Sequence, residues 1–262
     1  MTANEYKVNL SIVIPAYNEE RRLVQTFQQL EHLQSHDLRF WDKLQVIIVC
    51  DGCQDQTEQV ANQWSPEMID KLIVSYKVNK GKGGALQAGM AHTYGQIVSF
   101  IDADGATNPN ELPALAQKIL NNQADIVIGS RRTKDAILPC KQPWWRSCLG
   151  SAFVKVTTLI LNIPVKDTQC GCKLFDGASA RDLYAVSTTM GFATDLEILY
   201  MATKGNYRIH EQGICWQHIE GSTVSPLKDG IKMLYTVIKM RFASRHSAQP
   251  MRKPQPQTTR TL

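Results

Sequence analysis

The sequence lacks the features that mark several common protein classes. Its uncharged apolar runs are short: 156–165, for example, is ten residues long, whereas a helix needs about 20 apolar residues to span a membrane. The first residues do not follow the charged-then-apolar order of a secretory signal, and no segment is repeated. The sequence therefore predicts no membrane span, no signal peptide and no repeat architecture.

A large excess of charge of one sign is also missing. The formal net charge is +5, and part of it comes from Arg245, Arg252, Lys253 and Arg260 near the carboxyl terminus. Proteins that bind nucleic acid usually gather such charge on one face, so no nucleic-acid partner is expected. The tail 246–262 holds Pro, Gln, Thr and Arg with almost no apolar residues, a composition typical of disorder.

Cysteine occurs in no pattern that indicates disulfides or zinc. The seven cysteines cannot all pair within one chain, and without a secretory signal a reducing cytoplasm is the expected compartment. Cys50-x-x-Cys53 and Cys170-x-Cys172 together offer four thiols, but the second spacing does not fit a zinc knuckle. A zinc site is not expected.

The first half of the chain alternates short buried runs with longer amphipathic segments. The pattern predicts an α/β fold, in which right-handed crossovers build a mostly parallel sheet flanked by helices. Ligands of such sheets bind beyond the carboxyl ends of the strands. The predicted strands are 10–14, 44–50, 72–76, 97–101 and 126–128, and the predicted helices are 19–33, 83–94 and 109–120, the last capped by Asn108.

The second half, from about residue 132, is richer in predicted helices. They cover 145–161, 194–203 and 227–242, with a polar loop at 164–173 and a hairpin at 207–218. In the last helix, Ile231, Ile238 and Phe242 share one side and lysines line a narrow opposite strip. Such a face favours either packing against the domain or docking on an anionic membrane, where Trp144 and Trp145 would suit the headgroup depth.

The strongest chemical signal is Asp102-Ala-Asp104, directly after the run 97–101. Two carboxylates at a strand end offer the hard oxygen ligands that Mg²⁺ prefers, and a divalent cation there would neutralise a diphosphate. The alternative is a solvated turn that ends in Gly105.

Other strand ends carry weaker signals. Pro15-Ala-Tyr-Asn-Glu19 follows the first strand as a turn with an aromatic ring, or as a plain helix start, and Asp51 after the second strand can accept from a base N–H. Lys80-Gly-Lys-Gly-Gly84 lacks the spacing of a P-loop, but glycines that open a helix beside Lys82 favour an anion. Arg131 and Arg132 form either a phosphate clamp or an exposed pair.

Taken in chain order, these blocks resemble a family-2 glycosyltransferase of GT-A fold, with the closest likeness to dolichyl-phosphate β-glucosyltransferases. The resemblance covers 11–242. It is carried by Ser11-Ile-Val-Ile-Pro-Ala-Tyr-Asn-Glu-Glu20, Asp51-Gly52 with Asp55, Asn79-Lys-Gly-Lys-Gly-Gly-Ala85, Asp102-Ala-Asp-Gly-Ala-Thr107, Gly129-Ser-Arg131, Asp167-Thr-Gln-Cys-Gly-Cys-Lys-Leu-Phe175 and Gly221-Ser222.

The resemblance implies a single domain over 1–245, with a nucleotide-sugar half at about 8–131 and an acceptor half at about 132–245. It implies a bound Mg²⁺ or Mn²⁺ on Asp102 and Asp104, and Asp195 as the general base. The remaining implied site residues are Pro15, Ala16, Tyr17 and Glu19 around the uridine and ribose, Asp51 on the uracil, Asp102 on the donor, and Lys82, Arg131 and Lys173 as cations for the diphosphate or the acceptor phosphate.

The implied reaction is an inverting transfer of glucose from UDP-glucose to a polyprenyl phosphate by a peripheral protein at the cytoplasmic membrane face. If the acceptor is a phosphate monoester, its dianion is already a nucleophile, and Asp195 would instead orient the acceptor or position cations. A different nucleotide sugar, a hydroxyl acceptor, or a nucleotide-sugar-binding protein without turnover remain as alternatives.

The sequence departs from the family at two places. Cys50 and Cys53 stand where the common pattern has Asp and Ser, and the amino-terminal membrane anchor of eukaryotic members of the glucosyl branch is not seen.

Overall fold

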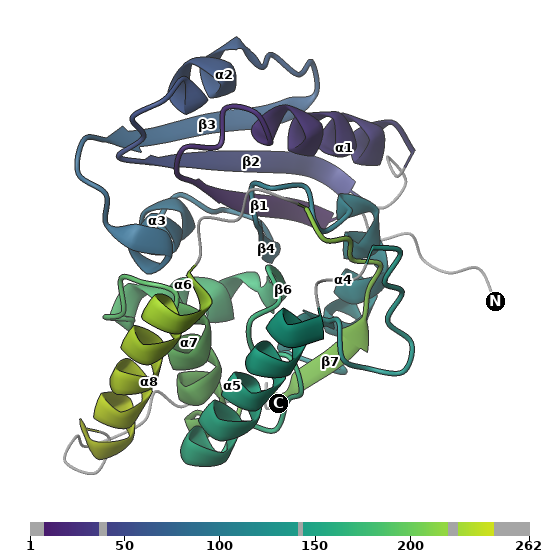
Figure 1. Cartoon of the computed structure of the whole chain (residues 1–262). Coiled ribbons are helices and arrows are strands. Elements are labelled where there is room, and N and C mark those ends of the chain that lie inside the picture. Colours follow the sequence, from purple (N-terminus) through teal and green to yellow (C-terminus); the bar gives the residue numbers. More distant parts are fainter. Residues whose placement is uncertain (1–7, 37–40, 141–143, 220–224, 244–262) are drawn as a thin grey trace, which may run out of the picture.

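The computed structural model describes residues 8–36, 41–140, 144–219 and 225–243. The tail predicted to be disordered, 246–262, and Gly221-Ser222 lie outside the described residues. Within them, strands and helices alternate as the sequence predicts up to residue 130 (Figure 1).

A seven-stranded sheet runs through the molecule in the order β3-β2-β1-β4-β6-β5-β7. All neighbouring pairs are parallel except those of β6, which is antiparallel to both β4 and β5. The mostly parallel α/β fold is therefore confirmed. The strands are β1 (Val8–Ala16), β2 (Trp41–Asp51), β3 (Ile69–Tyr76), β4 (Ile97–Ile101), β5 (Ile126–Ser130), β6 (Cys172–Asp176) and β7 (Ile209–Gly213).

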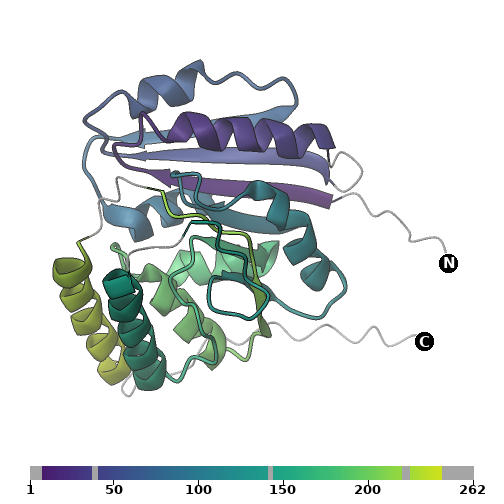
Figure 2. The same cartoon turned by 45° about the vertical axis from the view of Figure 1, so that its right-hand side comes forward.

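Helices cover both faces of this sheet (Figures 1 and 2). They are α1 (Leu23–His36), α2 (Thr57–Gln63), α3 (Gly81–Met90), α4 (Leu112–Leu120, after a 3₁₀ turn at Pro109–Glu111), α5 (Trp144–Leu161), α6 (Gly177–Val186), α7 (Thr194–Lys204) and α8 (Pro226–Ala243). Asn108 accepts a hydrogen bond from Asn110 N and so caps the 3₁₀ turn, as predicted.

Side chains of the inner strands alternate between two cores. Leu10, Ile12 and Ile14 of β1 pack with α1, α2 and α4, whereas Val13 packs with α3, α6 and α7. A strand that is buried on both faces reads as a continuous apolar run, which is typical of parallel sheets. This explains why the sequence pattern located these strands correctly.

Close packing fixes the position of α3 on the sheet. A methyl group at Gly89 would lie 2.4 Å from Val13 Cγ1 and 2.9 Å from Val49 Cγ2, distances that no side chain tolerates. The glycine therefore lets α3 approach β1 and β2 closely, and the first turn of α3 carries Lys82.

Two predictions for the second half are wrong. The segment 207–218 is no hairpin, because β7 pairs in parallel with β5. The predicted polar loop 164–173 ends inside β6, where Lys173 lies opposite Phe100 of β4. A lysine at the second position of this five-residue strand hides the strand pattern. The helix α6, which begins with Gly177, was also not predicted.

Candidate active site

The carboxyl ends of β1, β2 and β4 meet at one edge of the sheet because these strands are parallel neighbours. Ala16 ends β1, Asp51 ends β2 and Asp102 follows β4. Arg131 follows β5, which is antiparallel to β6 as β4 is, so β4 and β5 also end on the same side. The structure thus brings the predicted site residues of the first half to a common edge.

The turn before α3 is organised around Asp51. Its carboxylate oxygens accept hydrogen bonds from Lys80 N at 2.7 Å and Gly81 N at 2.8 Å, and its side chain is only 2% exposed. Gly83 N and Gly84 N donate instead to the backbone carbonyl of Met190, at 2.7 and 3.2 Å.

The amides that were expected to bind a ligand anion therefore already have acceptors within the protein. The anion at this turn is the carboxylate of Asp51 itself. Contact between Asp51 and a uracil stays a prediction, and any such contact would use lone pairs that the two amides leave free.

Four charged side chains form a continuous chain of ion pairs, here called the ion chain: Asp102, Lys82, Asp195 and Lys173. Lys82 Nζ lies 3.0 Å from Asp102 Oδ1 and 3.2 Å from Asp195 Oδ2. Lys173 Nζ lies 2.6 Å from Asp195 Oδ1 and donates to the carbonyl of Cys170 at 2.8 Å. The lysine side chains also approach the Phe100 ring, at 5.0 and 5.2 Å from its centroid.

The ion chain becomes less accessible toward its inner end. The side chain of Asp102 is 39% exposed, that of Lys82 12%, that of Asp195 2% and that of Lys173 0%. Contact between Lys173 and a phosphate stays a prediction; in the structure its ammonium contacts Asp195 from inside the protein. A buried charge is stable only when it is paired, and Asp195 provides that pair.

Burial and the two lysines act in opposite directions on Asp195. Burial favours its neutral form, but Lys173 and Lys82 outweigh this effect and hold the pKa of Asp195 below its usual value. In the same way, burial would lower the pKa of Lys82, and Asp102 and Asp195 raise it. Since an efficient general base has a pKa near the working pH, this geometry disfavours Asp195 as a base.

Asp104 differs from the ion chain because it makes no ion pair with any described residue. Its Oδ1 accepts one hydrogen bond, from Ala106 N at 3.0 Å. Burial, and then the charge of Asp102, raise the pKa of Asp104. Two carboxylates that repel each other in a partly buried place are stabilised by a cation between them.

These residues fit a divalent metal of the Mg²⁺ or Mn²⁺ type. Among the residues that the structure describes, no group of three or more metal-ligating side chains occurs, so Asp102 and Asp104 would be the two protein ligands. Mg²⁺ is commonly bound by one or two carboxylates, with substrate phosphates and water completing the shell. Gly171 makes room, because a methyl group there would lie 1.8 Å from Asp102 Oδ2.

The turn after β1 holds the predicted uridine-side residues. Tyr17 is 36% exposed, whereas Pro15 and Ala16 belong to the strand end. Glu19 pairs with Arg22, yet burial outweighs this partner and raises the pKa of Glu19 to about 7.

The segment before α2, together with the first residue of that helix, hydrogen-bonds to this turn. Thr57 Oγ1 accepts from Glu19 N at 2.7 Å, Asp55 accepts from Glu20 N at 3.2 Å, and the Cys53 thiol donates to the carbonyl of Ala16 at 3.4 Å. Asp55 also accepts a hydrogen bond from the backbone N of Thr57, the first residue of α2, but the N-cap position itself is occupied by Gln56.

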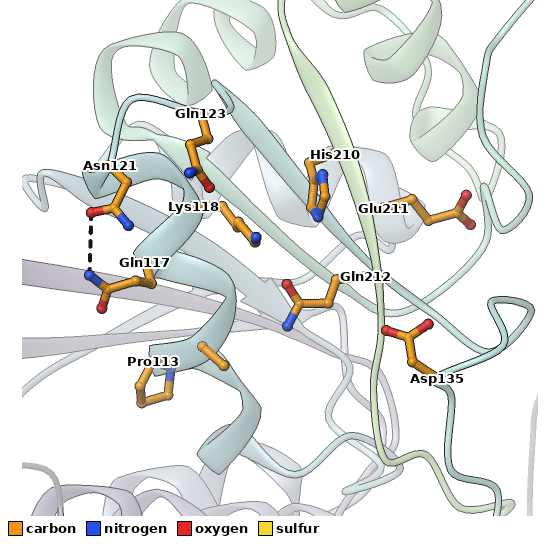
Figure 3. Close-up of a pocket in the computed structure, with 10 residues that line it drawn as sticks. Pro113, Gln117, Lys118, Asn121, Gln123, Asp135, His210, Glu211 and Gln212 are labelled. Atoms are coloured by element: carbon orange, nitrogen blue, oxygen red, sulfur yellow. Dashed lines mark hydrogen bonds between the residues drawn. The ribbon is translucent and has the colours of Figure 1, made fainter.

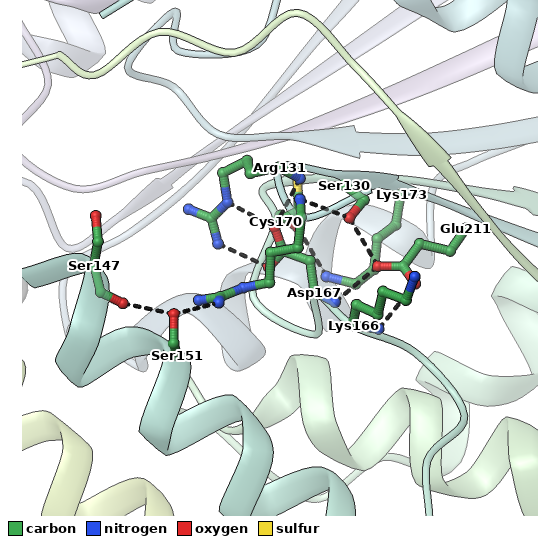
Figure 4. Close-up of polar contacts among 10 residues, drawn as sticks. Ser130, Arg131, Ser147, Ser151, Lys166, Asp167, Cys170, Lys173 and Glu211 are labelled. Carbon is green, nitrogen blue, oxygen red and sulfur yellow. Dashed lines mark hydrogen bonds and ion pairs between the residues drawn. The ribbon is translucent and has the colours of Figure 1, made fainter. Parts of the chain in front are cut away.

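Arg131 is held by Asp167 in a two-pronged ion pair (Figure 4). Nε and Nη2 of the guanidinium donate to the two carboxylate oxygens at 2.7 and 2.8 Å, and the backbone N of Arg131 donates at 3.0 Å. Burial would raise the pKa of Asp167, but Arg131 overcomes it and lowers that pKa. Most of the charge of Arg131 is thus compensated within the protein.

Glu211 of β7 supports this pair and was not predicted. Its carboxylate accepts from Asp167 N, Lys166 N and Ser130 Oγ, each at 2.8 Å. No sequence signal marks Glu211, because the sequence pattern predicts a hairpin over this strand. Asp167, in contrast, lay within a block that carried the family resemblance.

The pocket shown in Figure 3 lies away from the predicted site residues. Its volume is about 840 Å³ and α4 and β7 line it with polar side chains such as Gln117, Asn121 and Gln212. None of the predicted site residues lines it. The strand-end edge therefore remains the candidate site.

Comparison with known proteins decides the family. The sequence model described as glycosyl transferase family 2 matches residues 11–181, which is more than half of the chain. The chain belongs to this family. One curated relative is the dolichyl-phosphate β-glucosyltransferase of Dictyostelium discoideum. It is 34% identical to this chain over 246 residues, and the match covers 90% of this chain and 74% of the relative.

The human protein of the same name is 33% identical over 236 residues, with 86% of this chain and 72% of the relative covered. A solved structure of glucosyl-3-phosphoglycerate synthase from Mycobacterium tuberculosis, in complex with Mn²⁺ and UDP-glucose, matches with a TM-score of 0.65. It is 19% identical, and the match covers 89% of this chain and 79% of that one. At this identity the likeness supports the GT-A fold and no more.

Proposed function

We propose that this chain is an inverting hexosyltransferase that moves glucose from UDP-glucose to a polyprenyl phosphate, assisted by Mg²⁺ or Mn²⁺. The observation that carries the proposal is the ion chain beside Asp104, which has no ion pair with a described residue, at the edge where sheets of this kind bind their ligands. The choice of glucose and of a lipid phosphate draws on the names of the curated relatives.

On the donor side, Asp102 and Asp104 would hold the metal, which when bound supplies Lewis-acid stabilisation of the charge on the leaving UDP. Lys82 fixes Asp102 from one side, so this carboxylate needs little rearrangement. Arg131 is fixed in position by Asp167 before the reaction begins, although this ion pair compensates most of its charge.

On the acceptor side, the environment of Asp195 favours a phosphate over a hydroxyl. A phosphate monoester has a second pKa of about 6, so it reaches the site as a dianion and needs no base. Asp195, whose oxygens are both occupied by lysines, then acts as a positioning residue that holds Lys82 and, through it, Asp102.

The outer faces of α5 and α8 support peripheral binding to a membrane. The two helices pack side by side (Figure 2). Of the 16 large hydrophobic side chains that are exposed in the described residues, four lie on each of these helices, so half of them gather on one helix pair. They include Trp144 at 78%, Leu159 at 82% and Tyr235 at 71% exposure.

The charges near these side chains are mostly positive. Lys155 on α5 and Lys228, Lys232 and Lys239 on α8 are exposed, whereas the acidic residue of α8, Asp229, accepts from Ser225 N at its first turn. Apolar side chains flanked by lysines are typical of surfaces that bind anionic lipids. Within the described residues, every helix is too short or too polar to cross a bilayer.

The decisive experiment is a donor panel against a short polyprenyl phosphate, with the linkage of the product determined. Release of UDP from UDP-glucose only when the lipid phosphate is present, with a β-linked product, is expected. Product formed from GDP-mannose alone would contradict the choice of sugar. Binding of UDP-glucose without turnover on any acceptor would contradict the assignment as an enzyme.

Asp195→Asn separates the two acceptor classes. With a phosphate acceptor the variant should keep a measurable rate, because no proton has to be removed. Complete loss of turnover in a variant that still folds and binds UDP would indicate a hydroxyl acceptor and a general base.

Vesicle sedimentation tests the membrane surface. Ile231→Ser, on the exposed face of α8 (70% exposed), should weaken binding to anionic vesicles by about tenfold, since a buried aliphatic side chain contributes 1.5–3 kcal/mol. Met68→Ser is the matched control, because Met68 is 63% exposed but lies just before β3. Equal binding of both variants would rule out this surface.

A further inference from the structure

Cations at the site differ in whether the protein already neutralises them. Lys82 and Lys173 are paired in the ion chain, and Arg131 is paired with Asp167. Arg132, the next residue, makes no ion pair within 4.0 Å with any carboxylate of the described residues. A phosphate that must be bound and then react needs a cation whose charge is still available.

Arg132 is nevertheless held in place. Its Nη1 donates to Ser151 Oγ of α5 at 2.6 Å. Ser151 in turn donates to the carbonyl of Ser147 at 2.7 Å, as Figure 4 shows. Its backbone N donates to Ser130 Oγ at 3.1 Å. The guanidinium is thus oriented by neutral hydrogen-bond partners rather than by an ion pair with a described carboxylate.

One donor of this guanidinium has no acceptor. Nε of Arg132 is buried and makes no hydrogen bond within the described structure. Leaving such a donor unpaired is costly, more so on a charged group. Burial, and the charge of Arg131, lower the pKa of Arg132, and the charges of Asp167 and Glu211 only partly offset this. A bound anion would accept a hydrogen bond from Nε and would also stabilise the positive charge of Arg132.

The surroundings indicate which anion fits. Arg132 lies between the carboxyl end of β5 and α5, the helix whose outer face carries Trp144 and Leu159. In the segment after Asp167, two further buried polar atoms, Thr168 Oγ1 and Gln169 Nε2, have no hydrogen-bond partner among the described residues. Both are able to donate hydrogen bonds to phosphate oxygens.

We propose that Arg132, oriented by Ser151, binds the phosphate group of the lipid acceptor where it emerges from the membrane beside α5. This inference rests on the proposed function, since it assigns the acceptor subsite of the same enzyme. It transfers the phosphate-binding role that the sequence suggested for Lys173 to a residue whose charge the protein does not already neutralise.

The test is titration calorimetry with a short water-soluble prenyl phosphate, on the full chain with Mn²⁺ and UDP present so that no turnover occurs. Arg132→Gln should weaken binding by about tenfold or more, as expected for loss of a charge-assisted hydrogen bond. Arg132→Lys should restore part of the affinity. Arg21→Gln, which removes the same charge from a side chain that is 91% exposed, should bind like the original protein.

Inorganic phosphate and the corresponding prenol form two further arms. Weak binding of both, with tight binding of the prenyl phosphate, is expected if the occupant is the lipid. Tight, Arg132-dependent binding of inorganic phosphate without binding of the prenyl phosphate would overturn the lipid assignment. Ser151→Ala removes only the hydroxyl that orients Arg132 and should weaken prenyl phosphate binding a few-fold. This variant keeps the test decisive if the arginine variants fail to fold.

Kinetics give an independent readout that a purely structural role would not produce. In Arg132→Gln the KM for the prenyl phosphate should rise while the KM for the donor and the affinity for UDP stay unchanged. Unchanged acceptor binding in Arg132→Gln would overturn this inference and leave the proposed function intact. Failure of the original protein to bind any prenyl phosphate, while it still binds UDP, would overturn both.

Discussion

In the ion chain each charge is paired inside the protein, whereas on the outer faces of α5 and α8 exposed lysines stand beside exposed apolar side chains. The first arrangement fixes the geometry of side chains that come from four different parts of the sequence. The second leaves both charge and apolar surface available to a partner. Substitutions in the two regions should therefore affect different quantities, and the following predictions are arranged from the largest expected effect to the smallest.

Asp195→Asn should destabilise the fold by about 3–5 kcal/mol, because it leaves the ammonium of Lys173 buried without a counter-charge. Chemical denaturation at neutral pH measures this loss. The double variant Asp195→Asn with Lys173→Met should recover much of the stability, since both charges are then removed. A single variant as stable as the original protein would show that the ion chain is not energetically coupled.

Asp104→Asn should remove activity without lowering the stability of the fold, unlike Asp195→Asn. The variant loses a proposed metal ligand, so the rate should fall by about two orders of magnitude, or about 3 kcal/mol in the activation free energy. Stability should stay the same or rise, because the repulsion between Asp104 and Asp102 disappears. Parallel measurement of turnover and of denaturation checks both outcomes.

Asp167→Asn should cost about 2 kcal/mol of stability at neutral pH, through loss of the charged hydrogen bonds to Arg131. The pKa of Asp167 is lowered in the folded protein, so its contribution is complete above the unfolded value of about 4 and is lost as the pH falls through the lowered folded value. The gap between the variant and the original protein should therefore narrow on acidification below about pH 4. A gap that is independent of pH would contradict the ion-pair explanation.

Two nearby residues of α8 give the smallest and most local comparison. Val237 is fully buried, whereas Tyr235 is 71% exposed. Val237→Ser should cost about 1.5 kcal/mol through lost apolar burial, and Tyr235→Ser should stay within about 0.5 kcal/mol. Thermal denaturation measures the stability of both variants. Similar losses of stability would mean that the outer face of α8 packs against the protein.

How far the sequence could predict the molecule depended on the range of the interactions. The strands β1 to β5 are runs of β-branched and aliphatic residues, so local pattern located them, and Asp102 and Asp104 could be placed at a strand end from the same pattern. The pairing of Asp195 with Lys173 joins a helix to an antiparallel strand that the pattern did not show. No periodicity reports such a contact.

The ion pair of Arg131 was not predicted for the same reason, because it joins residues that are distant in the sequence. The sequence suggested a phosphate clamp from the residue type, but the structure turns its planar fork toward Asp167, 36 residues later in the chain. Which of two adjacent arginines is neutralised depends on tertiary packing. Residue chemistry indicated the class of site, and only the fold indicated which cations are still available.

The place of β6 has a consequence for how the chain can be divided. This strand comes from the second half of the sequence but lies between β4 and β5, which come from the first, and it is hydrogen-bonded to both. A fragment that stopped after β5 would leave the facing edges of β4 and β5 without their shared neighbour. The two halves of the sequence therefore do not form separable modules, and recombination with a relative should exchange loops rather than halves.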